Sequence, residues 1–417
     1  MNQAIVAGII LVAIFILFLT EKLPLATTAL IGAIAVGCFG LVEFDTVFQS
    51  FTSNSVILMI SMMVVGSSLF YSGLGNIIGK KLLKFTGSNE RSIIFVGALA
   101  GALLSSVCSG TATMVTLFPI VTSMCIAAGI SVSRVYLPYI YGVGFGSMLT
   151  LVGSGLGPAS SAILEEAGYK GWSFLEPAKV GVPLMLVGMI VLLTVGIKLL
   201  PTHHIDGENV NVNEDNTPVK MTKDMWISAI VLLTVVVFMM LEPEGVPLYI
   251  ISSIGAVILV ITGCMSQKQF YDSISWNSVF LIAGMSTVAK GIQTSGLAEI
   301  IANSMIKLVG GTTNELIVIG MLLLVTSILT NFLSNNAALL LMAPIALGMA
   351  ETIGIDPRTL IMTVYVGALS SFCTPMATPA ISYVMEPGGY KIKDLFRIGI
   401  VMQVAYFVVG MIVIPMI

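Results

Sequence analysis

Two short polar motifs, 225 residues apart, interrupt apolar stretches of this sequence. The first is Ser109-Gly110-Thr111, within residues 91–127, and the second is Ser334-Asn335-Asn336, within residues 314–350. Polar residues inside apolar segments are costly in hydrocarbon and usually belong to a functional site. Hydroxyl, carbonyl and amide oxygens suit a hard cation such as Na⁺, whereas helix N-termini and amide N–H groups suit an oxyanion. The two motifs therefore predict two half-sites of one binding site for a small anion and a cation.

A second polar segment follows each motif. Thr150–Ser154 reads Thr-Leu-Val-Gly-Ser, and Thr374–Pro379 reads Thr-Pro-Met-Ala-Thr-Pro. Glycine and proline interrupt helices at depth in a membrane protein where the freed backbone lines a cavity. We therefore expect broken helices over 134–160 and 358–385, each contributing to the same site.

The composition identifies the class of protein. Hydrophobic residues make up 57% of the 417 residues, and charged residues only 9%, whereas about a quarter of a soluble domain is charged. The sequence predicts an all-α polytopic membrane protein, and a net charge of −3 gives no reason to expect a nucleic-acid partner.

Hydropathy divides the chain into predicted spans and two longer segments. The segments 91–127 and 314–350 are too long for one crossing, and each is interrupted by its polar motif, which predicts a re-entrant hairpin. The remaining apolar segments are of the length of single spans: 3–20, 24–41, 54–72, 134–160, 175–199, 224–241, 247–264, 276–293, 358–385 and 394–416.

An internal repeat relates the two halves. Pro24-Leu25 recurs as Pro247-Leu248, and Asn54-Ser55-Val56 recurs as Asn277-Ser278-Val279, both 223 residues later. We expect a first repeat over 1–200, a cytoplasmic linker over 201–222 and a second repeat over 223–417. Each repeat has five spans and one hairpin. Because five is odd, the second repeat is inverted and the hairpins enter from opposite faces.

The distribution of basic residues predicts the orientation. With both termini outside, thirteen Lys and Arg residues fall on the inner side and five on the outer side, as the positive-inside rule requires. The chain is therefore expected in the cell membrane. The inner residues are Lys22, Lys80, Lys81, Lys84, Arg91, Arg134, Lys198, Lys220, Lys223, Lys268, Lys391, Lys393 and Arg397.

The centres of the predicted spans contain no Asp, Glu, Lys, Arg or His. This argues against a proton antiporter built on buried acids. No nucleophile, metal cluster or acid pair is visible at depth either, so we do not expect an enzyme.

The doubled motifs, with Pro344-Ile345 and Ala377-Thr378-Pro379, resemble those of the divalent anion:sodium symporter family of di- and tricarboxylate transporters. That family has a Ser-Asn-Thr motif at each hairpin tip and a Gly-Thr-Pro or Ala-Thr-Pro motif in each broken helix. The resemblance implies an elevator-type homodimer with a mobile transport domain and a fixed scaffold. It also implies a secondary active transporter that couples small dicarboxylates (succinate, malate or fumarate) to one or two Na⁺ ions.

The resemblance also implies residue roles. Substrate would bind at Ser109, Gly110, Thr111, Ser154, Ser334, Asn335, Asn336, Thr378 and Pro379. The first sodium site would use Ser105, Ser109, Gly110 and Gly153, and the second Thr330, Leu333, Asn335 and Ala377.

We expect four departures from the family pattern. Gly110 replaces the family Asn, Asn336 replaces Thr, and Gly153-Ser154-Gly155 replaces Gly-Thr-Pro. The fourth expected departure is the family's extra N-terminal span, whose absence would leave ten spans. The Gly110 change removes an amide ligand from the first sodium site. The sequence therefore leaves open the number of Na⁺ ions, symport or exchange, and another substrate (citrate, sulfate or arsenite). A Na⁺/H⁺ antiporter of the same architecture is a further alternative.

Overall fold

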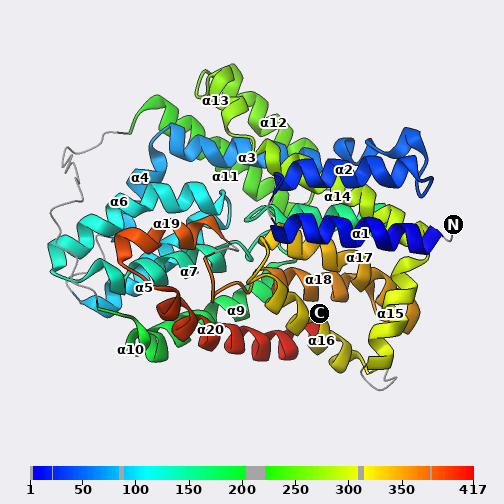
Figure 1. The fold of residues 1–417 in the computed structure, drawn as a ribbon. Coiled ribbons are helices and arrows are strands. Elements are labelled where there is room, and N and C mark those ends of the chain that lie inside the picture. Colours follow the sequence, from blue (N-terminus) through cyan, green and yellow to red (C-terminus); the bar gives the residue numbers. More distant parts are fainter. Residues whose placement is uncertain (1–2, 21, 84–88, 203–220, 309–313, 376–377) are drawn as a thin grey trace.

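The chain folds into a bundle of helices, in which no described residue belongs to a β-strand (Figure 1). The computed structural model describes residues 3–20, 22–83, 89–202, 221–308, 314–375 and 378–417. Within these described ranges, seven helical segments are long and apolar enough to cross a membrane, and three shorter apolar helices accompany them. The expected all-helical membrane architecture is confirmed.

The first four main helices of each half of the chain correspond in order and length. In the first half they are α1 (Gln3–Thr20), α2 (Leu25–Cys38), α3 (Asn54–Tyr71) and α4 (Leu74–Leu83). Their counterparts are α11 (Lys223–Leu241), α12 (Leu248–Ile261), α14 (Trp276–Thr294) and α15 (Leu297–Leu308). Helix α2 packs on α14, and α12 packs reciprocally on α3.

Each expected hairpin segment contains two helices joined by a short turn that holds the polar motif. The first pair is α5 (Glu90–Ser105) and α6 (Gly110–Ala128), and the second is α16 (Glu315–Leu329) and α17 (Asn335–Ile353). Figure 1 shows the first pair towards the left end of the molecule and the second towards the right. Both second helices end at a glycine with positive φ, Gly129 (66°) and Gly354 (80°), a conformation that glycine adopts at little steric cost.

Both expected broken helices are interrupted. The first consists of α7 (Tyr136–Gly146) and α8 (Leu156–Glu166), and the second of α18 (Pro357–Ala368) and α19 (Pro379–Gly388). Helix α8 continues six residues beyond the expected end of its span at residue 160. Each repeat closes with a long helix, α9 (Ala178–Val191, extended by a π-helical turn and α10, Ile197–Leu199) and α20 (Ile392–Val413), and these two helices pack together.

Small residues allow the broken helices to approach the hairpins closely. A Cβ on Gly142 of α7 would lie 2.2 Å from the carbonyl oxygen of Ala98 on α5, and one on Gly146 would lie 2.0 Å from that of Ala102. Glycine is therefore required at both positions for the backbones to touch. Small residues serve the same purpose at helix interfaces in membranes generally.

Hydroxyl pairs on α3 join the two repeats. Ser61 of α3 lies 2.6 Å from Ser252 of α12, and Ser68 lies 2.7 Å from Ser228 of α11 (Oγ to Oγ). All four side chains are buried. Each hydroxyl satisfies the other, so polar side chains are accommodated inside an apolar interface.

Candidate functional site

A cavity of about 290 Å³ lies where the turns of the two hairpins and the breaks of the two broken helices meet. Residues from both repeats line it, and none of the lining residues is charged. Its volume is at the lower end of the range for small-molecule sites. The expected site residues that line it are Ser109, Gly110, Thr111, Gly153, Ser154, Asn335, Asn336 and Thr378.

The other expected residues lie behind or beside this lining. Ser105, Thr330 and Leu333 are buried and do not line the cavity. Ser334 caps α17, and its Oγ accepts a hydrogen bond from the Ala337 N–H at 3.3 Å. Pro379 is the first residue of α19, and Ala377 lies outside the described residues.

The second half-site is built around Thr330 and Asn335. The Thr330 hydroxyl lies 2.9 Å from Asn335 Oδ1 and 2.7 Å from the carbonyl oxygen of Ala368, and it can donate to either. The Thr374 hydroxyl donates to the carbonyl of Asn331 in the hairpin turn. A hydroxyl oxygen and a carboxamide oxygen therefore meet at the cavity wall. The Thr374 bond fixes the broken helix to the hairpin.

The first half-site has the same plan with different side chains. The Ser105 hydroxyl donates to the carbonyl of Val143 at 2.5 Å and lies 3.1 Å from Ser147 Oγ. The Thr150 hydroxyl donates to the carbonyl of Ser106, as Thr374 does in the second half-site. Gly110 stands where the repeat places Asn335, so it offers no carboxamide here.

Two tyrosines connect the half-sites reciprocally. Tyr141 of α7 donates to the carbonyl of Phe372 at 2.9 Å, and Tyr365 of α18 donates to the carbonyl of Ser147 at 3.1 Å. Tyr141 and Tyr365 are 224 residues apart, as expected for repeat partners. Because each repeat donates the same kind of tyrosine hydrogen bond to the other, the broken helices have a local two-fold relationship.

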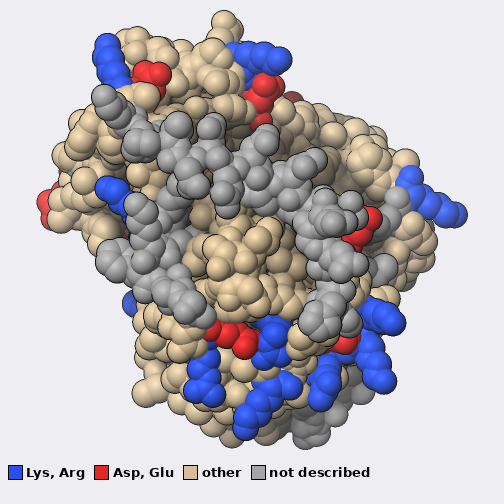
Figure 2. All heavy atoms as spheres, turned by 90° about the vertical axis from the view of Figure 1, so that its left-hand side faces the viewer, with Lys and Arg blue, Asp and Glu red and all other residues tan. Residues whose placement is uncertain are grey.

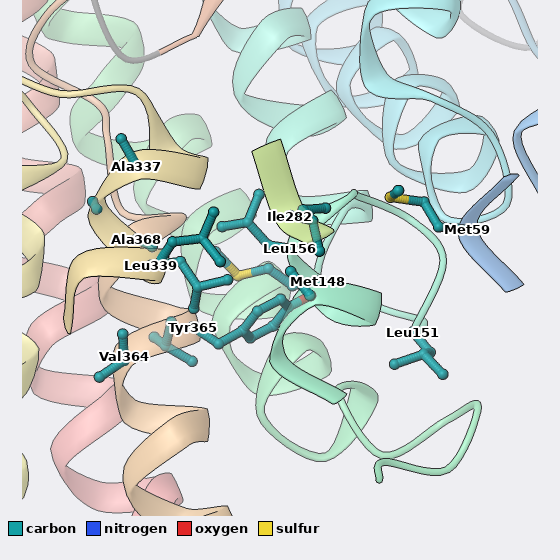
Figure 3. Close-up of a cluster of buried hydrophobic side chains, with 14 of the residues drawn as sticks. Met59, Met148, Leu151, Leu156, Ile282, Ala337, Leu339, Val364, Tyr365 and Ala368 are labelled. Atoms are coloured by element: carbon teal, nitrogen blue, oxygen red, sulfur yellow. The ribbon is translucent and has the colours of Figure 1, made fainter. Parts of the chain in front are cut away.

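An apolar cluster supports the site. Figure 3 shows Tyr365 beside Met148, with Leu156, Leu339 and Ala368 close by, so that α7–α8 of one repeat pack against α17–α18 of the other. All are buried. Close packing of this kind holds the polar residues of the cavity lining in fixed positions.

A buried side-chain oxygen of Asn336, in the cavity lining, lacks a hydrogen-bond partner in the described part of the chain. Asn336 Oδ1 is buried and has no hydrogen-bond partner among the described residues. An unpaired buried polar atom costs about 1–3 kcal/mol, so such atoms call for an explanation. The position of Asn336 in the cavity lining explains the unpaired oxygen, since a bound ligand can supply the missing hydrogen bond.

Sequence reasoning missed several lining residues. Met59, Met62 and Met63 of α3 face the cavity, as do Ser275 and Ser278 at the start of α14. Ser278 belongs to the Asn-Ser-Val recurrence, and that signal could have identified it. The methionines carry no such signal, because their spacing is that of any buried helix.

Ionisable residues occur near the end of α8, outside the cavity lining. Glu165 accepts hydrogen bonds from Ser55 of α3 at 3.1 Å and from Ser161 at 3.2 Å. Both carboxylate oxygens of Glu166 are buried. The sequence placed both residues beyond the end of a span, and the longer α8 brings Glu165 into contact with α3.

The comparisons with known proteins agree with this architecture. A sequence model described as citrate transporter matches residues 15–367. An uncharacterized transporter of Haemophilus influenzae is 24% identical over 97% of this chain and 90% of its own. Sodium/sulfate cotransporter 1 of Chlamydomonas reinhardtii is 26% identical over 56% of this chain, which covers 27% of that relative.

Two solved transporters share the fold. The YdaH transporter of Alcanivorax borkumensis has a TM-score of 0.63 and 15% identity, with 90% of each chain covered. MtrF of Neisseria gonorrhoeae has a TM-score of 0.62 and 15% identity, with 90% of this chain and 84% of that chain covered. These identities establish the fold and leave the substrate open.

The family and the relatives are transporters and not enzymes, as the sequence predicted. The resemblance to divalent anion:sodium symporters is confirmed, since the matched family is of the same kind. This chain is a multi-pass membrane transporter that belongs to the citrate transporter family.

Proposed function

We propose that this chain is a Na⁺-coupled secondary transporter of small dicarboxylates such as succinate, malate or fumarate. The observation that carries the proposal is the neutral cavity formed by both hairpin turns, where Ser109–Thr111 faces Asn335–Asn336. Amide N–H groups at the starts of α6 and α17 suit the carboxylates, because helix N-termini favour negative charge. Without a lining Lys or Arg, a bound cation supplies the remaining positive charge.

Sodium would be held by oxygen atoms in the two half-sites. The oxygens of Thr330 and Asn335 form the core of the second, with Leu333 and Ala377 contributing. Ser105, Ser109, Gly110 and Gly153 contribute to the first. Oxygen ligands are those that hard cations prefer, and a relative named as a sodium/sulfate cotransporter supports the choice of Na⁺.

The transport movement would be an elevator motion within a homodimer. In this proposal the hairpins and the broken helices move together, and the remaining helices of repeats 1–200 and 223–417 form the scaffold. The reciprocal tyrosine bonds support movement as one body, because they tie the broken helices to each other. Alternating access in inverted-repeat transporters commonly moves one bundle against the rest.

The proposed orientation places both termini outside and linker 201–222 in the cytoplasm. Figure 2 views the end of the molecule that lies at the left in Figure 1, and Lys and Arg side chains are prominent on it. A basic cytoplasmic face supports this orientation.

The description of the matched family favours citrate as a second candidate substrate. Uptake of radiolabelled succinate into proteoliposomes, driven by an inward Na⁺ gradient, tests the proposal, with unlabelled citrate and sulfate as competitors. We expect succinate uptake that requires Na⁺ and is not replaced by K⁺. Uptake of labelled citrate alone, or uptake indifferent to Na⁺, would contradict it.

A further inference from the structure

We propose that Ser147 supplies to the first half-site the oxygen ligand that Asn335 supplies to the second, so that this half-site binds Na⁺ despite Gly110. The inference rests on the proposed function, because it concerns the ion of the same site. It assigns a ligand role to a residue that neither the motif nor the repeat alignment indicates.

The first step is the space in front of Gly110. A Cβ built on Gly110 would lie 3.3 Å from Val143 Cγ1 and 3.7 Å from Ser147 Oγ. A side chain at position 110 would therefore start beside Val143 and the Ser147 hydroxyl. Ser147 thus lies next to the space that an asparagine side chain at position 110 would need.

The second step is the pairing of oxygens. In the second half-site, Thr330 Oγ1 and Asn335 Oδ1 are 2.9 Å apart. In the first, Ser105 Oγ and Ser147 Oγ are 3.1 Å apart. Each half-site thus presents two side-chain oxygens at nearly the same separation, although the residue types differ.

The third step concerns the hydroxyl hydrogens. Ser105 and Ser147 can both donate to the carbonyl of Val143, at 2.5 and 3.1 Å. A serine hydroxyl has one hydrogen and two lone pairs. When both hydroxyl hydrogens point at the Val143 carbonyl, the lone pairs of Ser105 Oγ and Ser147 Oγ remain available to a cation. A bound cation would also relieve the repulsion between these two neighbouring oxygens.

The fourth step is the exchange of side chains between the repeats. The reciprocal tyrosine bonds give the carbonyls of Ser147 and Phe372 equivalent roles, since each accepts from the tyrosine of the other repeat. The first half-site therefore combines Gly110 with Ser147, and the second combines Asn335 with Phe372. In each pair one residue offers a side-chain oxygen and the other does not.

Binding of radioactive sodium to the purified protein in detergent tests the inference without requiring transport. We expect Asn335→Ala to retain Na⁺ binding at the first half-site. Adding Ser147→Ala to it should weaken the remaining binding by at least about tenfold, as expected for the loss of one charge-assisted contact. The matched control is Ser370→Ala, since Ser370 is buried and donates to the Val366 carbonyl but does not line the cavity.

A rescue experiment separates a ligand role from a structural one. Gly110→Asn alone should impair Na⁺ binding, because the carboxamide meets Val143 and Ser147. Gly110→Asn combined with Ser147→Gly restores one side-chain oxygen and should recover binding to within a few-fold of the wild type.

Unchanged Na⁺ binding in Asn335→Ala/Ser147→Ala relative to Asn335→Ala would overturn the inference. A folded Gly110→Asn/Ser147→Gly protein that binds no better than Gly110→Asn alone would overturn it as well. If Na⁺ binds as described while no dicarboxylate is transported, the proposed substrate is wrong and the assignment of Ser147 stands.

Discussion

Asn336 Oδ1 lies close to Gly155 in the cavity lining, so that a Cβ on Gly155 would be 4.0 Å from that oxygen. Asn336 comes from the hairpin turn of the second repeat, and Gly155 from the break between α7 and α8 of the first. The absence of a side chain at Gly155 leaves open the space in front of Asn336 Oδ1, which has no partner among the described residues. Residues of both repeats thus meet in the lining of one small site.

This relationship predicts that the side chain at position 155 controls the size of the substrate. Gly155→Ala adds a methyl group whose nearest neighbours lie at 3.9–4.0 Å, so folding should be preserved. We expect the inhibition constant of citrate to rise more than that of succinate, because the cavity becomes narrower. Competition in the proteoliposome assay measures both, and equal changes for the two acids would argue against this wall as the limit on size.

Asn335 is expected to be essential for ion coupling. Asn335→Ala removes the carboxamide oxygen beside Thr330 and should reduce Na⁺-driven uptake by about ten- to a hundredfold, the range for losing a supporting residue of a metal site. Asn314→Ala is the matched control. Asn314 caps the far end of α16, and its loss costs about 1 kcal/mol of stability without a change in Na⁺ dependence. Near-normal uptake by Asn335→Ala would remove this residue from the ion site.

The close contact between α5 and α7 makes Gly142 intolerant of substitution. Gly142→Ala would place a methyl group 2.2 Å from the Ala98 carbonyl oxygen, and overpacking of this kind costs about 1–3 kcal/mol. We expect a clearly lower melting temperature in detergent. Gly97→Ala on α5, where a Cβ meets nothing within 4 Å, should melt like the wild type. The close approach of the helices would be in doubt if the two variants were equally stable.

The Arg358–Glu176 ion pair is expected to stabilise the start of the second broken helix. Arg358 also donates to the carbonyls of Lys170 and Gly171, and the Glu176 side chain is 10% exposed. Removing Arg358 leaves that carboxylate largely buried without its partner, which is destabilising. Arg358→Ala should therefore lower the melting temperature, whereas Arg397→Ala, at an exposed position on α20, should not. A melting temperature unaffected by Arg358→Ala would show that the pair adds little.

The reciprocal hydrogen bonds of Tyr141 and Tyr365 should hold the two broken helices together. Tyr365→Phe removes the donor to the Ser147 carbonyl, and Tyr141→Phe removes the donor to Phe372. Loss of a buried hydrogen bond costs about 1–3 kcal/mol when the acceptor is left unpaired. Both variants should melt earlier than Tyr71→Phe, which alters an exposed ring at the end of α3. Equal melting temperatures of the three tyrosine variants would contradict a structural role for these two hydrogen bonds.

Much of the architecture could be predicted from the sequence. The duplicated motifs, the hydropathy and the recurrence of Pro, Asn, Ser and Gly at nearly constant offsets identified the helical membrane fold and the hairpin segments. The cavity lining contains Ser109–Thr111, Gly153-Ser154, Asn335-Asn336 and Thr378. These positions could be identified from the sequence because polar residues stand out in an apolar chain.

The remaining features depend on three-dimensional packing. The offset between repeats is 225 at Gly110 and Asn335 but 224 at Tyr141 and Tyr365, and no sequence register reveals that Ser147 lies beside Gly110. In the sequence, the methionines of α3 cannot be distinguished from core residues. Only the packing of the hairpins against α3 shows that they line the cavity. Helix α8 runs past the predicted span, which brings Glu165 to Ser55.

The central claim is that the two hairpin turns enclose one site for an anion and Na⁺. A cryo-electron microscopy map of the purified protein in Na⁺ and succinate tests it most directly. The account predicts density for the anion between Ser109–Thr111 and Asn335–Asn336, with ion density beside the Thr330–Asn335 oxygen pair. A map that shows succinate bound elsewhere, with this cavity empty, would contradict it.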